Sequence, residues 1–429
     1  MPRGIPARRR PEPGGWFPGD PCLRQIVSEP GLRADPSTRR RRFTSRGGPG
    51  APMEFAACRG NGRRRPISGH AGERSARAGQ RAALQARGRA PIVAATSTAR
   101  VPQARRWRVK SLLLMAPFWD PYCPPLGIAS LQAFLRQRGR DVAIFDFNTD
   151  KEVWRSQRQY FDLLVDVIPA ARGWNIMRLG PDYFARHQMA WLRLRHRPER
   201  YRELAARILD IDGRQEIDRG RLEEFDRVFE RIYARLDTLM DGLLKEHRPT
   251  AVGATLLTTT MPASVHLLQR AKEADPAIRT ALGGPGPIMG AGADSPDTQR
   301  ILDLCPWIDN VIIGEGEILT DALHQGILEP GRLYSLKDVP KLSADPRLAT
   351  DTKKGLIRDI GSLPTPDYSG LNVGQYANLS VGVTRGCAYH CAFCYETTFW
   401  KRYRKRPVGG ALRDMATLRA AHDRKNFFL

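Results

Sequence analysis

Three cysteines crowded into one short segment are the residues best suited to chemistry. Cys387, Cys391 and Cys394 follow a short apolar run with a C-x3-C-x2-C spacing. Thiolates are typical ligands of iron–sulfur clusters, and a short loop allows three of them to surround one cubane. A structural cluster uses four cysteines, so three would leave one iron open to a substrate or cofactor. An open metal position is likewise what distinguishes catalytic from structural zinc sites.

A zinc site or three unliganded thiols are the alternatives for this segment. Zinc would need a fourth ligand, and His390 adjoins Cys391 too closely to share the same ion comfortably. The chain has seven cysteines, an odd number, with three of them inside eight positions. A secreted disulfide framework would spread an even number through a short chain. We therefore favour metal-bound thiolates in a reducing compartment, the cytoplasm.

The segment Gly382–Tyr395 resembles the cluster-binding loop of the radical S-adenosylmethionine (SAM) superfamily, with the motif CxxxCxxC and an aromatic residue before the last cysteine. The resemblance implies that Cys387, Cys391 and Cys394 bind a 4Fe-4S cluster whose fourth iron is chelated by SAM. Phe393 would then lie near the SAM adenine. It also implies an enzyme that forms a 5′-deoxyadenosyl radical, which abstracts hydrogen from a small-molecule or peptide substrate. A reductant such as flavodoxin or ferredoxin would supply the electron.

Upstream of the cysteines, apolar runs of strand length alternate with amphipathic segments. The expected strands are Val109–Ala116, Asp141–Phe147, Ala251–Leu257, Thr280–Gly283 and Asn310–Gly314. The expected helices are Leu126–Arg138, Pro262–Ala274, Asp297–Leu304 and Ile318–Gln325. This alternation predicts an α/β, doubly wound, Rossmann-like (flavodoxin-like) parallel sheet, whose ligands bind beyond the carboxyl ends of the strands.

The loops at those strand ends resemble the cobalamin-binding domain that precedes the barrel in one class of radical SAM enzymes. The resemblance is carried by the Pro124–Gly127 turn, the Thr258–Thr260 loop, Gly283-Gly284-Pro285 and Gly314-Glu315-Gly316-Glu317. It implies that the residues in contact with cobalamin are Pro124, Pro125, Leu126, Gly127, Thr258, Thr259, Gly283, Gly284, Pro285, Gly314, Glu315 and Gly316. The first loop lacks the histidine of the D-x-H-x-x-G motif, so we expect no histidine beneath the cobalt. That would fit methyl transfer to an unactivated carbon, although related enzymes catalyse rearrangements or ring closures.

The sequence predicts four regions. They are a disordered Arg-rich segment (1–108), a cobalamin-binding-like domain (109–330) with a helical insertion (150–248), a linker (331–375), and the start of a radical SAM partial TIM barrel (376–429). The last region holds only the first β/α unit, with a strand at Leu379–Val383 and a helix at Gly410–His422. We therefore expect a truncated chain that does not turn over alone.

Most of the positive charge lies in the first region. Residues 1–100 contain 21 Arg, no Lys and 6 acidic residues, which accounts for +15 of the formal net charge of +24. A transit peptide and an RNA-binding arm are two explanations. We favour a third, translation upstream of a true start at Val109 or Met115, because GC-rich DNA encodes Arg without Lys.

Other functions compete with a cobalamin-dependent radical SAM enzyme. The sheet domain could have lost cobalamin, the chain could be an inactive fragment, or the Arg-rich segment could make it a nucleic-acid-binding protein. Nucleic acid is the less favoured partner because the remaining 329 residues carry only +9. No run of 18 apolar residues occurs, so no membrane is expected. The basic run Lys401–Arg406 is expected to be a solvated face.

Overall fold

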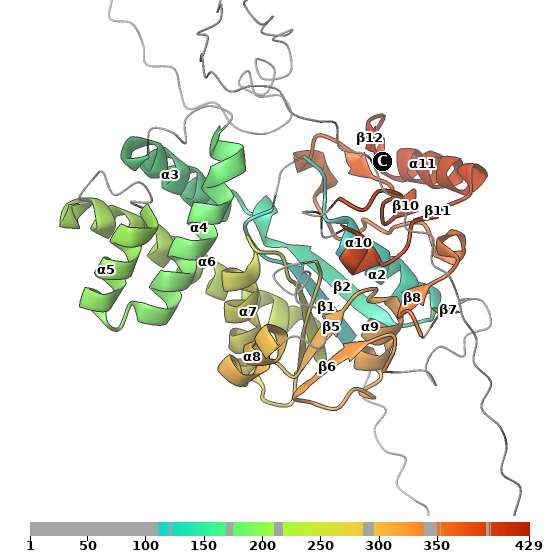
Figure 1. The fold of residues 1–429 in the computed structure, drawn as a ribbon, viewed down its shortest axis with the longest axis horizontal. Helices are drawn as coiled ribbons and strands as arrows, with labels where there is room; N and C mark the ends of the chain where they lie inside the picture. Colours follow the sequence, from blue (N-terminus) through green and yellow to red (C-terminus); the bar gives the residue numbers. More distant parts are fainter. Residues whose placement is uncertain are drawn as a thin grey trace, which may run out of the picture. The chain divides into compact units, whose positions relative to one another are not determined.

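A central parallel sheet organises the part of the chain that the structure describes. The computed structural model describes residues 110–119, 122–168, 175–209, 218–285, 296–338, 350–351, 353–391, 394 and 396–429. The six strands are β1 (Lys110–Met115), β2 (Asp141–Asp146), β3 (Ala251–Thr255), β4 (Arg279–Gly283), β5 (Asn310–Ile313) and β6 (Arg332–Ser335). They lie in the order β2-β1-β3-β4-β5-β6, and every neighbouring pair is parallel (Figure 1). The predicted doubly wound fold is confirmed.

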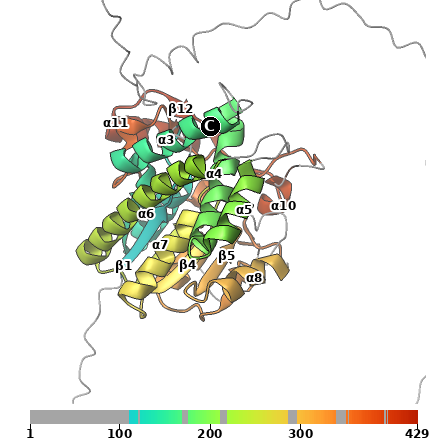
Figure 2. The same cartoon turned by 90° about the vertical axis from the view of Figure 1, so that its left-hand side faces the viewer.

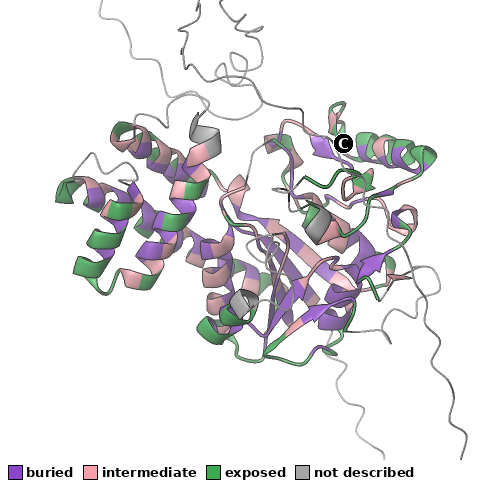
Figure 3. Cartoon of the chain, in the orientation of Figure 1, coloured by how far each residue is buried: buried purple, intermediate pink, exposed green. Residues whose placement is uncertain are grey.

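Helices follow the strands as the alternation predicted. They are α2 (Leu126–Gln137), α7 (Met261–Ala274), α8 (Pro296–Leu304) and α9 (Glu317–His324). The strand β1 is buried on both faces, as expected for a parallel sheet between helical layers. Leu112 and Leu114 belong to one core cluster with residues of α7, whereas Leu113 and Met115 belong to another with Ile128 of α2. Figure 3 shows the sheet strands mostly in the colour of buried residues.

The structure differs from the sequence-based expectation in the segment predicted to be a linker. Strand β6 lies there and pairs with β5, so the sheet extends one strand beyond the predicted domain end at 330. Only Tyr334 and Ser335 of this edge strand are buried. A short edge strand of mixed polarity gives little periodic signal in the sequence. The remaining domain boundaries stay predictions.

In the described part of the predicted helical insertion, four helices follow a short 3₁₀ turn. They are η1 (Phe147–Thr149), α3 (Lys151–Val167), α4 (Asn175–Leu194), α5 (Pro198–Leu209) and α6 (Arg219–His247). Helix α6 packs against α7 of the sheet domain (Figure 2). His266 Nε2 of α7 lies 2.6 Å from Asp237 Oδ1 of α6. Phe225 and Phe229, one turn apart on α6, are fully buried, as expected for the apolar face of an amphipathic helix.

The C-terminal segment is built from short elements around a second parallel pair. They are β7 (Thr350–Asp351), β8 (Leu356–Ile357), η3 (Ile360–Ser362), η4 (Val373–Gln375), β9 (Leu379–Ser380), β10 (Thr384–Arg385), α10 (Glu396–Trp400), β11 (Arg404–Lys405), α11 (Val408–His422) and β12 (Phe427–Phe428). Strand β12 pairs in parallel with β9 after the helices, which is the strand–helix–strand connectivity of a β/α barrel unit.

Among the described residues, no helix combines the length and apolarity needed to cross a membrane. The Arg-rich segment 1–108, for which disorder was predicted, lies outside the described residues.

Candidate functional site

The three cysteines lie on a loop whose two ends are held together by an antiparallel pair. Thr384 and Arg385 of β10 pair with Lys405 and Arg404 of β11, and the cysteine loop (residues 386–395) follows β10 directly. Gly386 opens the loop at φ +77°, and a Cβ atom there would lie 2.7 Å from the carbonyl oxygen of Arg402. Only glycine fits so close a crossing in this backbone conformation.

All three thiols of the loop are free of disulfides and at least partly accessible. Cys387 and Cys394 are half-buried, and Cys391 is exposed. The amide of Tyr389 donates to the Cys387 sulfur at 3.4 Å, and the amide of Cys394 donates to the carbonyl of Cys391 at 3.0 Å. Thiols with this spacing are chemically suited to an iron–sulfur cluster.

The thiols share one loop but do not converge on one point. Among the described residues, no three or more His, Cys, Asp or Glu side chains gather closely enough to hold a metal ion. The assignment of Cys387, Cys391 and Cys394 as cluster ligands therefore stays a prediction. Phe393, predicted to lie near the SAM adenine, is outside the described residues.

Two glutamates at the end of β5 bind the arginine that precedes the cysteine loop. Arg385 donates from Nη1 to Glu315 Oε1 at 2.5 Å and from Nη2 to Glu317 Oε1. Both carboxylates are almost fully buried. Burial alone would lower the pKa of Arg385, but the charges of Glu317 and then Glu315 outweigh it and raise the pKa above its ordinary value. The guanidinium of Arg385 therefore stays charged inside the protein.

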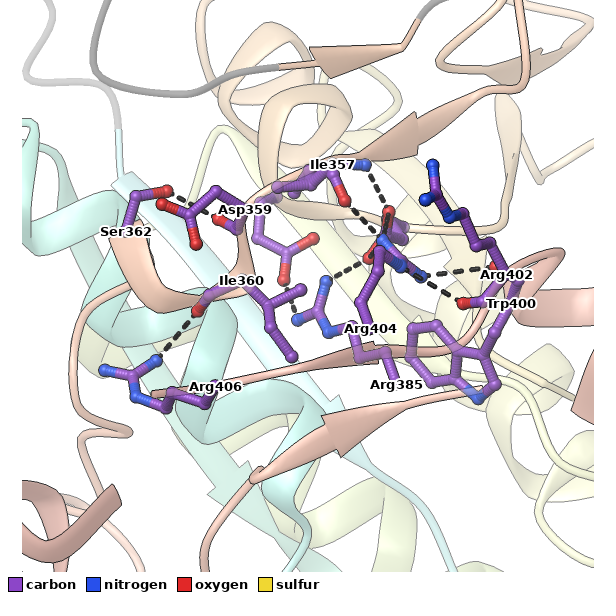
Figure 4. A network of polar contacts seen from close by, with 11 residues as sticks. Ile357, Asp359, Ile360, Ser362, Arg385, Trp400, Arg402, Arg404 and Arg406 are labelled. Carbon is purple, nitrogen blue, oxygen red and sulfur yellow. Dashed lines mark hydrogen bonds and ion pairs between the residues drawn. The ribbon is translucent and has the colours of Figure 1, made fainter. Parts of the chain in front are cut away.

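Arg404, on the far side of the cysteine loop, binds the same carboxylate. Its Nη1 lies 2.8 and 2.9 Å from the two oxygens of Glu315, and it also donates to the carbonyl of Ile357 at 2.5 Å. The amide of Ile357 completes the set by donating to Glu315 Oε2. Figure 4 shows Arg385 and Arg404 side by side with their hydrogen bonds. We call Glu315, Glu317, Arg385 and Arg404 the Glu–Arg network.

An aromatic ring supports the same arginine. The guanidinium carbon of Arg385 lies 5.2 Å from the ring centroid of Trp400, the last residue of α10 (Figure 4). This distance is within the range of cation–π attraction. Arg385, just before the cysteine loop, therefore contacts Trp400 after the loop and two carboxylates that follow β5.

The structure corrects the expectation that Lys401–Arg406 is a solvated face. Arg402 and Lys405 are exposed, but Arg404 is only 7% exposed and Arg406 pairs with buried Asp414 at 2.8 Å. Strand β11 alternates its side chains between solvent and the protein interior. Two of the arginines in the run are therefore internal anchors.

The loops predicted to contact cobalamin meet at the carboxyl edge of the sheet. The amide of Phe118, after β1, donates to the carbonyl of Thr259, after β3, at 3.3 Å. Gly284, after β4, has φ +139°, and a Cβ atom there would lie 2.7 Å from the carbonyl oxygen of Leu256. Gly314, after β5, has φ +82° with no heavy atom within 4 Å of its Cβ position. The bare backbone at Gly314 would admit a bulky ligand at this edge, whereas Gly284 is needed for close packing against Leu256.

The other predicted residues have mixed exposures. Pro124 and Pro125 are buried, whereas Thr258 and Gly127 are exposed. The residues with intermediate exposure are Leu126, Thr259, Gly283, Pro285 and Gly316. Glu315 differs from them because both of its oxygens are engaged within the protein. Its predicted contact with cobalamin is untested.

The first strand-end loop also contacts the strand that leads to the cysteines. A Cβ atom at Gly382 would lie 3.7 Å from Leu126 Cδ2, an ordinary packing distance. Leu126 packs in one apolar cluster with Leu379 and Val381, and the amide of Asn378 donates to the carbonyl of Tyr122 at 3.1 Å. The predicted cobalamin loop and the cysteine-bearing segment are thus neighbours.

A buried acid at the end of β2 holds the same loop in place. Asp146 accepts from the hydroxyl of Tyr376 and, at 2.8 Å, from Asn148 Nδ2. Asn148 Oδ1 in turn accepts from the amide of Trp119 at 2.8 Å. Burial raises the pKa of Asp146, although the hydrogen bonds from Tyr376 and Asn148 lower it in part. This acid links the sheet to both the β1 loop and the C-terminal segment.

Sequence reasoning missed Arg385, Arg404, Asp146 and Tyr376. The signals for two of them were present, since Arg385 directly precedes the Gly-Cys pair and Asp146 ends a buried strand. Arg404 was noted only within the basic run Lys401–Arg406, and no local pattern marks Tyr376. Their partners lie 89 and 230 positions away.

No family model matches the chain. The chain is 30% identical over 194 residues to an anaerobic magnesium-protoporphyrin IX monomethyl ester cyclase of Rubrivivax gelatinosus, a match that covers 42% of this chain and 33% of that protein. It is 29% identical over 187 residues to an uncharacterized methyltransferase of Pyrococcus horikoshii, a match that covers 41% and 38% respectively. The chain thus spans less than two fifths of the length of these relatives.

Among solved structures, the chain is similar to a radical SAM methyltransferase, TsrM, from Kitasatospora setae with a tryptophan substrate and a SAM analog bound. The sequence identity is 16% and the TM-score 0.38, over 73% of this chain and 46% of that chain. The similar proteins are methyltransferases and a cyclase, a radical SAM enzyme among them. The two curated relatives are a cyclase and a methyltransferase, and the radical SAM resemblance of the cysteine loop stays a prediction.

Proposed function

We propose that this chain takes part in radical SAM chemistry, with a 4Fe-4S cluster on Cys387, Cys391 and Cys394 and cobalamin at the carboxyl edge of the sheet. The proposed reaction is methyl transfer to an unactivated carbon, with an electron supplied by a protein such as flavodoxin or ferredoxin. The supporting observation is that the loop after β5 and the cysteine loop are joined by the Glu–Arg network.

When bound, the cluster, SAM and cobalamin would supply the electron, the radical and the methyl group. The chain itself orients and shields these groups. Gly386 turns the backbone so that the cysteine loop starts beside Arg402, and Arg385 and Arg404 fix both ends of that loop. At the sheet edge, Gly314 keeps a side chain out of the space beyond β5, whereas Gly284 allows the backbone after β4 to pass close to Leu256.

Anaerobic reconstitution tests the proposal. The chain is incubated with ferrous iron, sulfide and hydroxocobalamin, desalted, and examined by ultraviolet–visible spectroscopy. Both the iron–sulfur shoulder and the cobalamin bands should remain with the protein. An iron–sulfur shoulder without cobalamin would refute the cobalamin part alone, and loss of both signals would refute the whole proposal.

Two matched substitutions locate the cobalamin. Thr258→Trp places a large side chain at an exposed position of the carboxyl edge, whereas Ala277→Trp does so at the exposed turn before β4, at the opposite edge. We expect the first to remove the cobalamin bands and the second to keep them. Equal cobalamin retention by the two variants would contradict the assignment to the carboxyl edge.

A further inference from the structure

We propose that Glu317 is a positioning residue for the iron–sulfur cluster. Acting through Arg385, it neutralises a buried charge beside the cysteine loop and thereby keeps the cluster strongly reducing. The inference rests on the proposed function, because it assumes a cluster on the three cysteines. It assigns a specific role to the carboxylate that ends the Gly314–Glu317 segment.

The spacing in the chain makes Arg385 a near neighbour of the cluster ligands. Only Gly386 separates it from Cys387, so their Cα atoms are at most about 7 Å apart. Its side chain is held by Glu315, Glu317 and the Trp400 ring. Any displacement or change of charge at this guanidinium therefore acts on the start of the cysteine loop.

Glu315 and Glu317 make different contacts in the network. Glu315 uses both oxygens, since it binds Arg385, Arg404 and the amide of Ile357. Glu317 binds Arg385 through Oε1, and its buried Oε2 has no hydrogen-bond partner in the described part of the chain. Glu315 ties the C-terminal segment to the sheet, whereas Glu317 supplies the fourth charge of the set.

That fourth charge brings the network to neutrality. Two carboxylates and two guanidinium groups cancel, so the cluster would lie beside a set of charges with no net sign. Without Glu317, one positive charge would be left uncompensated in a poorly solvated place. A positive charge there favours the reduced cluster, which carries one more negative charge than the oxidised form. A higher reduction potential would make the cluster a weaker donor toward a sulfonium.

The unpartnered oxygen makes Glu317→Gln a clean substitution. The amide can keep its oxygen on Arg385 and place its nitrogen where Oε2 now lies without a partner. Shape and hydrogen bonding are then preserved, and only the charge is lost. Asp321→Asn offers a matched control, because Asp321 lies one turn later on α9 and pairs with Arg140 at 2.6 Å, outside the network.

The test is a redox titration of the reconstituted cluster, followed by electron paramagnetic resonance of the reduced form. We expect Glu317→Gln to raise the midpoint potential and Arg385→Gln to lower it. The double variant, which is again neutral, should return close to the wild-type value. Asp321→Asn should leave the potential unchanged. Circular dichroism of each variant verifies the fold.

An unchanged potential in a folded, cluster-bearing Glu317→Gln protein would overturn the inference while leaving the proposed function intact. So would a double variant with the same potential as Glu317→Gln alone, because Glu317 would then not act through Arg385. A wild-type chain that assembles no cluster would instead overturn the proposed function, and this inference with it.

Discussion

Arg404 Nη1 donates to both carboxylate oxygens of Glu315, at 2.8 and 2.9 Å, although 89 positions separate the two residues. Both side chains are almost completely buried. A buried ion pair contributes modestly to stability compared with apolar packing, but removal of one partner leaves an uncompensated charge inside the protein. This contact therefore makes the position of the cysteine loop depend on the sheet.

Glu315→Gln should destabilise the protein by about 3–5 kcal/mol, because buried Arg404 would lose its carboxylate partner and Arg385 would keep only that of Glu317. Urea unfolding followed by circular dichroism measures the change. The control is Glu203→Gln, which breaks the exposed pair with Arg207 on α5 and should cost no more than about 0.5 kcal/mol. Similar losses of unfolding free energy in the two variants would show that the buried network stabilises the protein no more than an exposed ion pair does.

Gly284→Ala should destabilise the protein by about 1–3 kcal/mol. The residue has φ +139°, and the new Cβ atom would lie 2.7 Å from the Leu256 carbonyl oxygen, which belongs to backbone and cannot rotate away. Gly127→Ala is the matched control, since its Cβ atom would meet no heavy atom within 4 Å and lies in helix α2. Thermal unfolding should separate the two variants. A wild-type melting temperature for Gly284→Ala would contradict the strain argument.

A buried histidine in the insertion gives the stability a pH dependence. His187 is fully buried, with Nδ1 3.2 Å from the Tyr160 hydroxyl and Nε2 2.9 Å from the Tyr201 hydroxyl. The Tyr201 hydroxyl donates to Asp226, so its oxygen is left to accept from Nε2–H. Burial lowers the pKa of the ring to about 3, so His187 is neutral at pH 7.

The sign of the effect follows from proton binding. Below about pH 6.5, the ordinary pKa of histidine, the unfolded chain binds a proton at His187 that the folded chain does not bind. The full stabilisation is therefore present above that pH. It falls by about 1.4 kcal/mol per pH unit as the pH decreases from 6.5 toward 3. Between pH 6.5 and 4.5, the free energy of unfolding should fall roughly 2–3 kcal/mol more in wild type than in His187→Gln. Parallel pH profiles would contradict this account.

Much of the sheet could be predicted from the sequence, because parallel strands buried on both faces appear as apolar runs such as Leu112–Met115. Strand β6 could not, since only the last two residues of its RLYS sequence are buried. Its pairing with β5, rather than its own composition, defines it.

The cysteines of the candidate site could be predicted from the sequence, but the buried Glu–Arg network that holds their loop could not. Spacing alone identified Cys387, Cys391 and Cys394 as candidate ligands. The burial of Arg404 was not predictable, because a basic run usually faces solvent and its carboxylate partner lies far away in the chain. The sequence likewise indicated Glu315 as a loop residue but gave no sign that its carboxylate binds two arginines.

Iron and acid-labile sulfide content test the central claim most directly. After anaerobic reconstitution, the wild-type chain and a Cys305→Ala variant, which lacks a buried thiol of the sheet domain, should hold equal amounts of both. The variant with Cys387, Cys391 and Cys394 all changed to Ala should hold neither. Wild-type levels of iron and sulfide in that triple variant would contradict the assignment of the cluster to this loop.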